Sequence, residues 1–129
     1  MFKNIINHGF LNFTGITSLL RSVDIFVGLG FPFEGPAPLE AIANGAIFIN
    51  PKFKLVLNDF LQFTSQLPYI ERLGKPYVYT VDVNDTKALA EAIRSALKEK
   101  PRPYLPEEFT PEGMLIRVNM LLSRDLCST

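Results

Sequence analysis

Short, continuously apolar runs alternate with amphipathic segments along the chain. Runs rich in isoleucine, valine and phenylalanine are typical of strands covered on both faces of a parallel sheet. They predict strands at 24–29, 46–49 and 77–81, and a shorter one at 4–7. Apolar residues at helical spacing predict four helices, near 14–22, from about Pro38 to position 44, over 82–100, and from Thr110 onward.

Capping residues indicate where these helices begin and end. Thr14 is the expected N-cap of the first helix, and Asn84 or Asp85 caps the third. Gly45 suits the position after the second helix, where a positive φ is common. Thr110, followed by a proline, suits the start of the last helix.

The last helix and the middle of the chain differ in clarity. The last helix carries an apolar stripe of Met114, Val118, Leu121 and Leu122. Residues 104–129 are therefore expected to form a closing helical region. Positions 51–76 mix apolar residues with prolines, show no sustained period and predict no long element.

The order of the elements predicts an α/β fold, a Rossmann-like parallel sheet with flanking helices. Right-handed crossovers place the carboxyl ends of parallel strands at one edge, where ligands bind in open sheets of this type. The loop at 28–38 leaves a strand and enters a helix. It is therefore the first place to expect chemistry.

Composition and charge exclude several classes of protein. The 129 residues suit one domain, and 47% of them are hydrophobic against 20% charged, which argues against disorder, collagen-like repeats and coiled coils. Thirteen basic residues balance thirteen acidic ones, with no basic stripe for nucleic acid. No run approaches the roughly 20 apolar residues of a membrane span. Cys127 is the single cysteine and is interpreted as a free thiol.

The loop at 28–38 has the composition of a ligand-binding loop. Its glycines, Gly28, Gly30 and Gly35, allow close approach of the backbone to a ligand or a positive φ. Its prolines, at 32, 36 and 38, lower the cost of ordering it. The following helix offers free N–H groups at its start, which suit a diphosphate without a metal ion. No cluster with metal-ligand spacing is evident.

Two carboxylates lie in or just after this loop, Glu34 and Glu40. A carboxylate accepts hydrogen bonds from sugar hydroxyls and can bind a ribose diol through both oxygens. A plainer interpretation has Glu40 complementing the helix dipole and Glu34 solvated in the loop. Spacing alone leaves both interpretations open.

The string GLGFPFEGPAPLEAIANG at 28–45 resembles the donor-binding signature of GT-B glycosyltransferases, although Glu34 and Glu40 are closer together than is common there. Continued by FINPKF at 48–53, it closely resembles the Golgi α-1,6-mannosylglycoprotein 6-β-N-acetylglucosaminyltransferase family. Three further segments resemble that family in the same order, TSQLPY at 64–69, GKPYVYTVDVND at 74–85 and PYLPEEFTPEGM at 103–114. The resemblance covers essentially the whole chain.

The resemblance implies a fold and a reaction. Residues 1–129 would be the C-terminal, donor-binding lobe of a two-lobe GT-B enzyme, with this chain a fragment of the longer protein. The enzyme would transfer N-acetylglucosamine from UDP-N-acetylglucosamine to the 6-hydroxyl of an α-mannose on N-glycans, with inversion and without a metal or cofactor. The catalytic base would lie on the other lobe, so no catalytic residue is expected here, and the isolated chain is expected to be inactive.

The resemblance also implies roles for residues. Glu40 would bind the ribose of UDP, and Glu34 with the backbone of 30–36 would line the sugar and diphosphate. His8, the only histidine, follows a predicted strand, and a structural or donor-lining role is favoured over that of a base. The full expected donor-binding set is His8, Gly28, Gly30, Phe31, Pro32, Glu34, Gly35, Pro36, Ala37, Pro38 and Glu40.

Two departures from the family stand out. The stretch at 53–64 looks shorter than its counterpart by more than ten residues and lacks its basic residues. Ala46 and Pro111 stand where the family often has cysteines, and we hypothesise that relatives join these by a disulfide that this chain has lost. Cys127 matches a family cysteine whose partner would lie outside this chain.

The resemblance also implies a type II membrane protein located in the Golgi lumen. The sequons at Asn12 and Asn84 fit that location, although Asn84 also suits a helix cap. Three other functions remain open, namely a GT-B enzyme with another nucleotide-sugar donor, a non-catalytic module that binds a nucleotide or a partner protein, and a generic flavodoxin-like domain.

Overall fold

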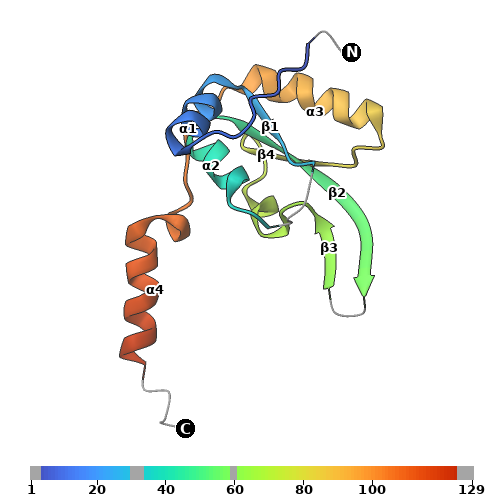
Figure 1. Ribbon diagram of the computed structural model, residues 1–129. Coiled ribbons are helices and arrows are strands. Elements are labelled where there is room, and N and C mark those ends of the chain that lie inside the picture. Colours follow the sequence, from blue (N-terminus) through green and yellow to red (C-terminus); the bar gives the residue numbers. More distant parts are fainter. Residues whose placement is uncertain (1–3, 30–33, 59–60, 125–129) are drawn as a thin grey trace.

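The structure is a computed structural model that describes residues 4–29, 34–58 and 61–124. Its centre is a parallel sheet of strands β1 (Ile25–Val27), β2 (Ile47–Asn58) and β4 (Val78–Val81), in the order β1-β2-β4 (Figure 1). Ile49 of β2 lies opposite Val27 on one side and Tyr79 on the other. The predicted parallel α/β arrangement is confirmed at this level.

Helices cover both faces of the sheet, and successive side chains of β2 point to opposite faces. Phe48 packs on the face of helix α2 (Ala37–Ala43), in a buried cluster with Ile42 and Val78. Ile47 and Ile49 pack on the face of helix α3 (Thr86–Glu99). Each fully buried side chain of this size contributes about 1.5–3 kcal/mol. A central strand buried on both faces explains why the run at 46–49 is continuously apolar.

Helix α1 (Phe13–Ser22) packs against α2 through Leu20, which is buried with Ala41 and Ala46. Its N-cap is Asn12, whose side-chain oxygen accepts from the N–H of Gly15 at 2.9 Å. The predicted cap, Thr14, is wrong, because it lies inside the first turn. The helix itself is confirmed.

The predicted strand at 4–7 is wrong. Asn4 lies in a turn and the residues after it form no regular element. Ile5 and Ile6 are 72% and 76% exposed. Two apolar residues between asparagines form a strand only when a neighbouring strand pairs with them. Within the described residues, β1 pairs only with β2, so residues 4–7 have no such neighbour.

Strand β2 continues well beyond the predicted end at position 49. It leaves the parallel sheet after Pro51 and forms an antiparallel hairpin with β3 (Leu61–Ser65). A 3-10 helix, η1 (Pro68–Leu73), follows the hairpin and returns the chain to β4. The described residues of 51–76 therefore form strands and a 3-10 helix, without a single sequence period because the pairing partners change along the segment.

Helix α3 begins at Thr86, four residues into the predicted range of 82–100 and directly after Asp85, one of the two predicted caps. Asp85 is the N-cap, and its side chain accepts from the N–H groups of Lys87 and Ala88, both at 3.0 Å. Asp82 and Asn84 form a turn before it. The helix packs on the sheet through Ala92 and Ala96, which are buried there. Lys100, with φ +47°, ends the helix.

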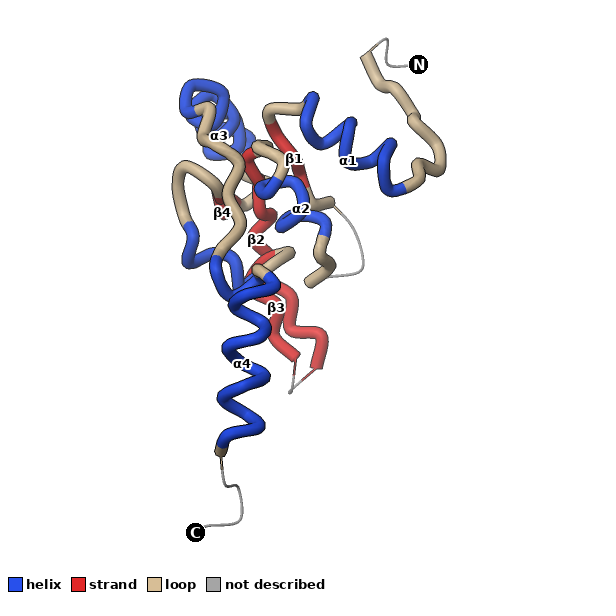
Figure 2. The backbone as a smooth tube through the Cα atoms, turned by 90° about the vertical axis from the view of Figure 1, so that its left-hand side faces the viewer, coloured by secondary structure: helices blue, strands red, loops and turns tan. Residues whose placement is uncertain are grey.

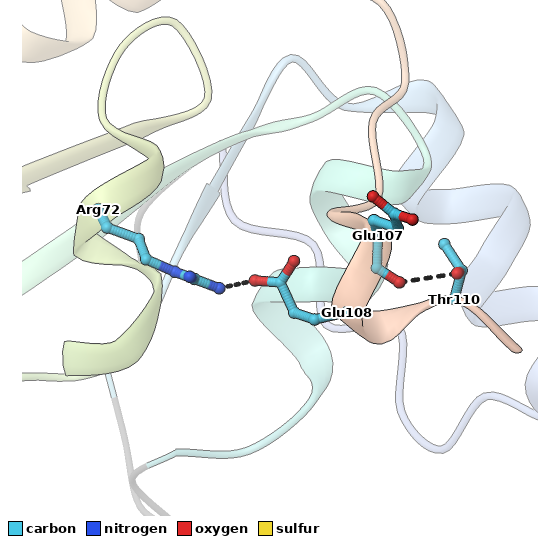
Figure 3. A network of polar contacts seen from close by, with 4 residues as sticks. All are labelled: Arg72, Glu107, Glu108 and Thr110. Atoms are coloured by element: carbon cyan, nitrogen blue, oxygen red, sulfur yellow. Dashed lines mark hydrogen bonds and ion pairs between the residues drawn. The ribbon is translucent and has the colours of Figure 1, made fainter. Parts of the chain in front are cut away.

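The segment after α3 covers the α2 face of the sheet. Tyr104 stacks on Tyr77 with 4.8 Å between ring centroids, and its N–H donates to the carbonyl of Ile42 at 3.2 Å. The short 3-10 helix η2 (Glu107–Phe109) follows. Its Glu108 forms an ion pair with Arg72 of η1, and the Thr110 hydroxyl donates to the Glu107 carbonyl (Figure 3).

Helix α4 (Pro111–Ser123) projects away from the sheet in both views (Figures 1 and 2). Thr110 is its N-cap as predicted, accepting from the N–H of Gly113 at 3.0 Å. The predicted stripe of this helix is exposed, with Leu122 at 81%, so the stripe does not pack on the described sheet, and the closing role of 104–129 stays a prediction. Periodicity identified the helix but not what it packs on. None of the helices in the described ranges is long and apolar enough to cross a bilayer.

Gly113 is where α4 meets η2. A Cβ there would lie 2.0 Å from the carbonyl oxygen of Glu107. Gly113→Ala is therefore expected to destabilise the chain by about 1–3 kcal/mol through overpacking. Without this contact, replacing glycine by alanine in a helix would raise the free energy of unfolding by up to about 1 kcal/mol. The sign of the measured change therefore shows whether the contact is present. Urea unfolding measures the change, Met114→Ala on the same helix is the exposed control, and a stabilised Gly113→Ala variant would contradict the packing.

Candidate functional site

The carboxyl ends of the three parallel strands meet at one edge of the sheet. Gly28 follows β1, Asn50 lies where β2 leaves the parallel sheet, and Thr80 lies beside Asn50 on β4. The loop predicted to carry the chemistry leaves this edge after β1 and returns as α2. Three residues of the predicted set, Gly30, Phe31 and Pro32, lie outside the described residues.

Gly28 is a glycine for a packing reason. A Cβ there would lie 2.8 Å from Cγ of Gln66 and 3.1 Å from the ring of Phe48. Its N–H donates to the carbonyl of Ile49 at 3.4 Å, which continues the ladder between β1 and β2. Its φ is outside the left-handed region, so close approach, rather than a positive φ, explains this residue.

Glu34 is held in a left-handed conformation, with φ +61°. Its N–H donates to the carbonyl of Gln66 at 3.2 Å, and its side chain is exposed. Tyr69 lies close enough that the negative charge of Glu34 adds to burial in raising the pKa of the Tyr69 phenol above 10.0. Glu34 is therefore flanked by the segment that follows β3.

A buried cluster of hydrogen bonds lies at this edge of the sheet, around Asn50. The side chain of Asn50 is fully buried, and its Nδ2 donates to the hydroxyls of Ser65 at 3.0 Å and Thr80 at 3.2 Å. Its Oδ1 accepts from the N–H of Leu67 at 3.0 Å. The Ser65 hydroxyl in turn contacts a carboxylate oxygen of Glu71.

This cluster is not among the features predicted from the sequence, because the pattern that indicates it is modest. An asparagine ends an apolar run at the carboxyl edge, and a polar Thr-Ser-Gln segment lies 14–16 residues later. Only the return of β3 to the sheet brings the two together.

Helix α2 starts at Ala37, one residue before the predicted Pro38. Pro38 is buried and has no N–H, so the first-turn groups without an intrahelical acceptor are the N–H groups of Ala37 and Leu39. Pro36 precedes the helix and makes no side-chain cap. Gly45 has φ +98° after the helix, as predicted.

Glu40 lies in the first turn of α2 with an exposed side chain. That position suits a carboxylate, since the helix dipole is positive there. Its exposure also leaves both oxygens available to a ligand. The structure thus accommodates both interpretations of Glu40.

The predicted residues fall into two groups. Gly28 and Glu34 are brought together through Gln66, and Gly35, Pro36, Ala37, Pro38 and Glu40 continue directly from Glu34 into α2. His8 belongs to neither group. The strand that was to place it at the ligand edge is not formed, and its side chain is exposed. Its donor-lining role stays a prediction without support from the sheet.

The structure also contains a cavity of about 580 Å³ that sequence analysis did not predict. It lies between η1, β4 and α3, and its polar lining includes Glu71, Lys75 and Glu91. Lys75 Nζ lies 5.1 Å from the centroid of the Tyr79 ring. The Tyr79 hydroxyl is buried without a hydrogen-bond partner among the described residues. None of the residues predicted to bind the donor lines this cavity.

The fold and the edge cluster define an α/β protein whose candidate ligand loop leaves the carboxyl edge of a parallel sheet. The model of glycosyltransferase family 18 matches residues 1–129. The chain belongs to this family, which confirms the resemblance drawn from the sequence.

Similar curated proteins carry the corresponding name. The chain is 52% identical over 139 residues to an alpha-1,6-mannosylglycoprotein 6-beta-N-acetylglucosaminyltransferase of Caenorhabditis elegans, covering 98% of this chain and 21% of that protein. Identity is 48% to the A form of Homo sapiens and 42% to the B form, over 94% of this chain and 18% and 17% of those proteins. The chain thus spans about a fifth of the length of these relatives.

The alignments also bear on chain length. The alignment to the Caenorhabditis elegans protein is about a dozen positions longer than the part of this chain that it covers. The relative therefore has residues without a counterpart here. The number agrees with the prediction that the stretch 53–64 is shorter than its counterpart by more than ten residues, and the position of the difference stays a prediction.

The proximity of Glu34 and Tyr69 is testable by titration. Glu34→Gln removes the negative charge, so the pKa of Tyr69 is expected to fall toward its ordinary value and stay above it because of burial. Nuclear magnetic resonance titration of the tyrosine rings measures the shift, and Tyr69→Phe assigns the signal. Glu99→Gln, at the end of α3, is the control. An unchanged Tyr69 pKa in Glu34→Gln would refute the arrangement.

Proposed function

We propose that this chain supplies the donor-binding site of a glycosyltransferase that moves N-acetylglucosamine from UDP-N-acetylglucosamine to the 6-hydroxyl of an α-mannose on N-glycans. The observation that carries the proposal is the loop at 28–38 on the carboxyl edge of the parallel sheet, in a chain of glycosyltransferase family 18. The names of the relatives specify a 6-β-N-acetylglucosaminyl transfer to an α-1,6-mannosylglycoprotein.

The proposed fold is the C-terminal Rossmann-like lobe of a GT-B enzyme. Its support is the parallel order β1-β2-β4 with α2 and α3 on opposite faces. Ligands of open parallel sheets bind beyond the carboxyl ends of the strands. The loop with Glu34 and the start of α2 lie there.

We assign Glu40 to the ribose of UDP and Glu34 to the sugar and diphosphate. An exposed carboxylate accepts from two vicinal hydroxyls, and such charge-assisted hydrogen bonds are among the stronger ones in proteins. The N–H groups of Ala37 and Leu39 are available to a phosphate oxygen at the start of α2. Gly30, Phe31 and Pro32 complete the proposed set.

In the proposed mechanism this chain positions the donor and stabilises the leaving UDP. The mechanism is inverting and uses neither a metal nor a cofactor. The base that deprotonates the acceptor hydroxyl belongs to the other lobe of the enzyme, so the chain by itself binds the donor without turnover.

The proposed location is the Golgi lumen, with a type II membrane topology. Two exposed asparagines in sequons support a lumenal protein, Asn12 before α1 and Asn84 before α3. The Asn12 oxygen caps α1, and its Nδ2 is the atom a glycan would modify.

Isothermal titration calorimetry with UDP tests the assignment of Glu40. Glu40→Gln keeps the shape and removes the charge, so the loss of its charge-assisted hydrogen bonds is expected to weaken binding by about tenfold to a hundredfold. Glu99→Gln, an exposed glutamate on α3, is the matched control and should leave the affinity unchanged.

Other outcomes of that experiment separate the alternatives. Tight binding of another nucleotide sugar with weak binding of UDP-N-acetylglucosamine identifies a different donor. Equal affinity of wild type and Glu40→Gln for UDP favours a generic α/β domain. No binding of any nucleotide by the folded chain contradicts the proposed donor site.

A further inference from the structure

The segment 65–69, here called the bracket, joins the buried cluster to the loop. On its inner side the N–H of Gln66 donates to the carbonyl of Pro51 at 2.9 Å. The N–H of Leu67 donates to Oδ1 of Asn50, and the Leu67 carbonyl accepts from Nδ2 of Asn50 at 3.4 Å. One buried amide therefore fixes the backbone of the bracket on both its donor and its acceptor side.

The outer side of the bracket contacts the loop at three places. The carbonyl of Gln66 accepts from the N–H of Glu34, and Cγ of Gln66 occupies the space that a Cβ of Gly28 would need. Tyr69 lies within electrostatic reach of the Glu34 carboxylate. The same short segment thus lies against the loop at Gly28 and hydrogen-bonds to it at Glu34.

We propose that the bracket forms a second wall of the nucleotide-sugar site, and that Asn50 is the positioning residue that holds it. This inference rests on the proposed function, because it takes a nucleoside diphosphate sugar as the ligand of the loop. It adds Asn50, Gln66 and Tyr69 to a site that sequence analysis confined to His8 and the 28–40 region. Asn50 acts through Leu67 and Gln66 and does not touch the ligand.

The chemistry of Asn50 explains why an amide stands there. Its side chain is fully buried and uses both a donor and an acceptor, which a hydrophobic residue or a carboxylate cannot do together. Removal of the amide leaves the N–H of Leu67 buried without its acceptor. Such a group forces the bracket to move toward water or to pair elsewhere.

The conformation of Glu34 explains why the loop needs an external hold. A residue other than glycine with φ +61° is held there by its surroundings and not by its own preference. The bond from its N–H to Gln66 supplies that hold. A shifted bracket releases Glu34 and moves its carboxylate away from the ligand.

The test compares UDP binding and amide exchange in three folded chains. Asn50→Ala is expected to weaken UDP binding by about tenfold and to speed hydrogen exchange of the Glu34 amide. The control is Ile47→Val or Ile47→Ala, whichever matches the thermal midpoint of Asn50→Ala. Ile47 is buried on the α3 face at the amino end of β2, so its loss destabilises without moving the bracket.

The results decide between positioning and mere stabilisation. Equal UDP affinity of Asn50→Ala and the matched control overturns the inference, as does unchanged Glu34 exchange in Asn50→Ala. Failure of the wild-type chain to bind UDP contradicts the proposed function and, with it, the bracket as a wall of a nucleotide-sugar site. The exchange of Glu34 still reports separately whether Asn50 holds the loop.

A second set of variants applies if Asn50→Ala does not fold. Gly28→Ala pushes on the Gln66 side chain, and Gln66→Ala makes room while keeping the backbone carbonyl. If the bracket sets the loop, the double variant binds UDP more tightly than Gly28→Ala alone. If the double variant binds no better, the added methyl acts through the ring of Phe48 or on the ligand itself, and the contact between Gln66 and Gly28 does not set the loop.

Discussion

Every strand of the described structure is paired through β2. Its first part lies between β1 and β4 in the parallel sheet, and its second part pairs with β3 in the opposite sense. Its apolar side chains also form the contact between the sheet and the helices on both faces. The candidate site depends on this strand twice, because β2 pairs with Gly28 at the start of the loop and, through its hairpin, returns the bracket to the same edge.

The elements that sequence predicted well are those whose signals are local. The buried run at 46–49, the helix α3 and the N-caps Asp85 and Thr110 are each encoded within a few residues. The loop at 28–38 was also found locally, since glycine, proline and two glutamates stand close together in it. These features needed no knowledge of what lies across the fold.

The features that sequence missed are those that depend on distant partners. The hairpin of β2 and β3 has no single period in the sequence. The role of Asn50 is visible only once the fold brings Ser65 and Leu67 within hydrogen-bonding distance of it. The opposite error arose at 4–7, where an apolar pair suggested a strand for which the described residues offer no neighbour. The stripe of α4 is a similar case, because periodicity specifies an apolar face and leaves its partner open.

The hairpin allows the length of this segment to change without a change in the geometry of the site. Its arms run out from the sheet beyond Pro51, while the residues that contact the loop sit at its base. The entropic cost of closing a longer connection grows slowly, by about 0.6 kcal/mol for each doubling of its length. The connection between Asn58 and Leu61 is therefore a place where insertions, natural or engineered, can accumulate while the base keeps its register.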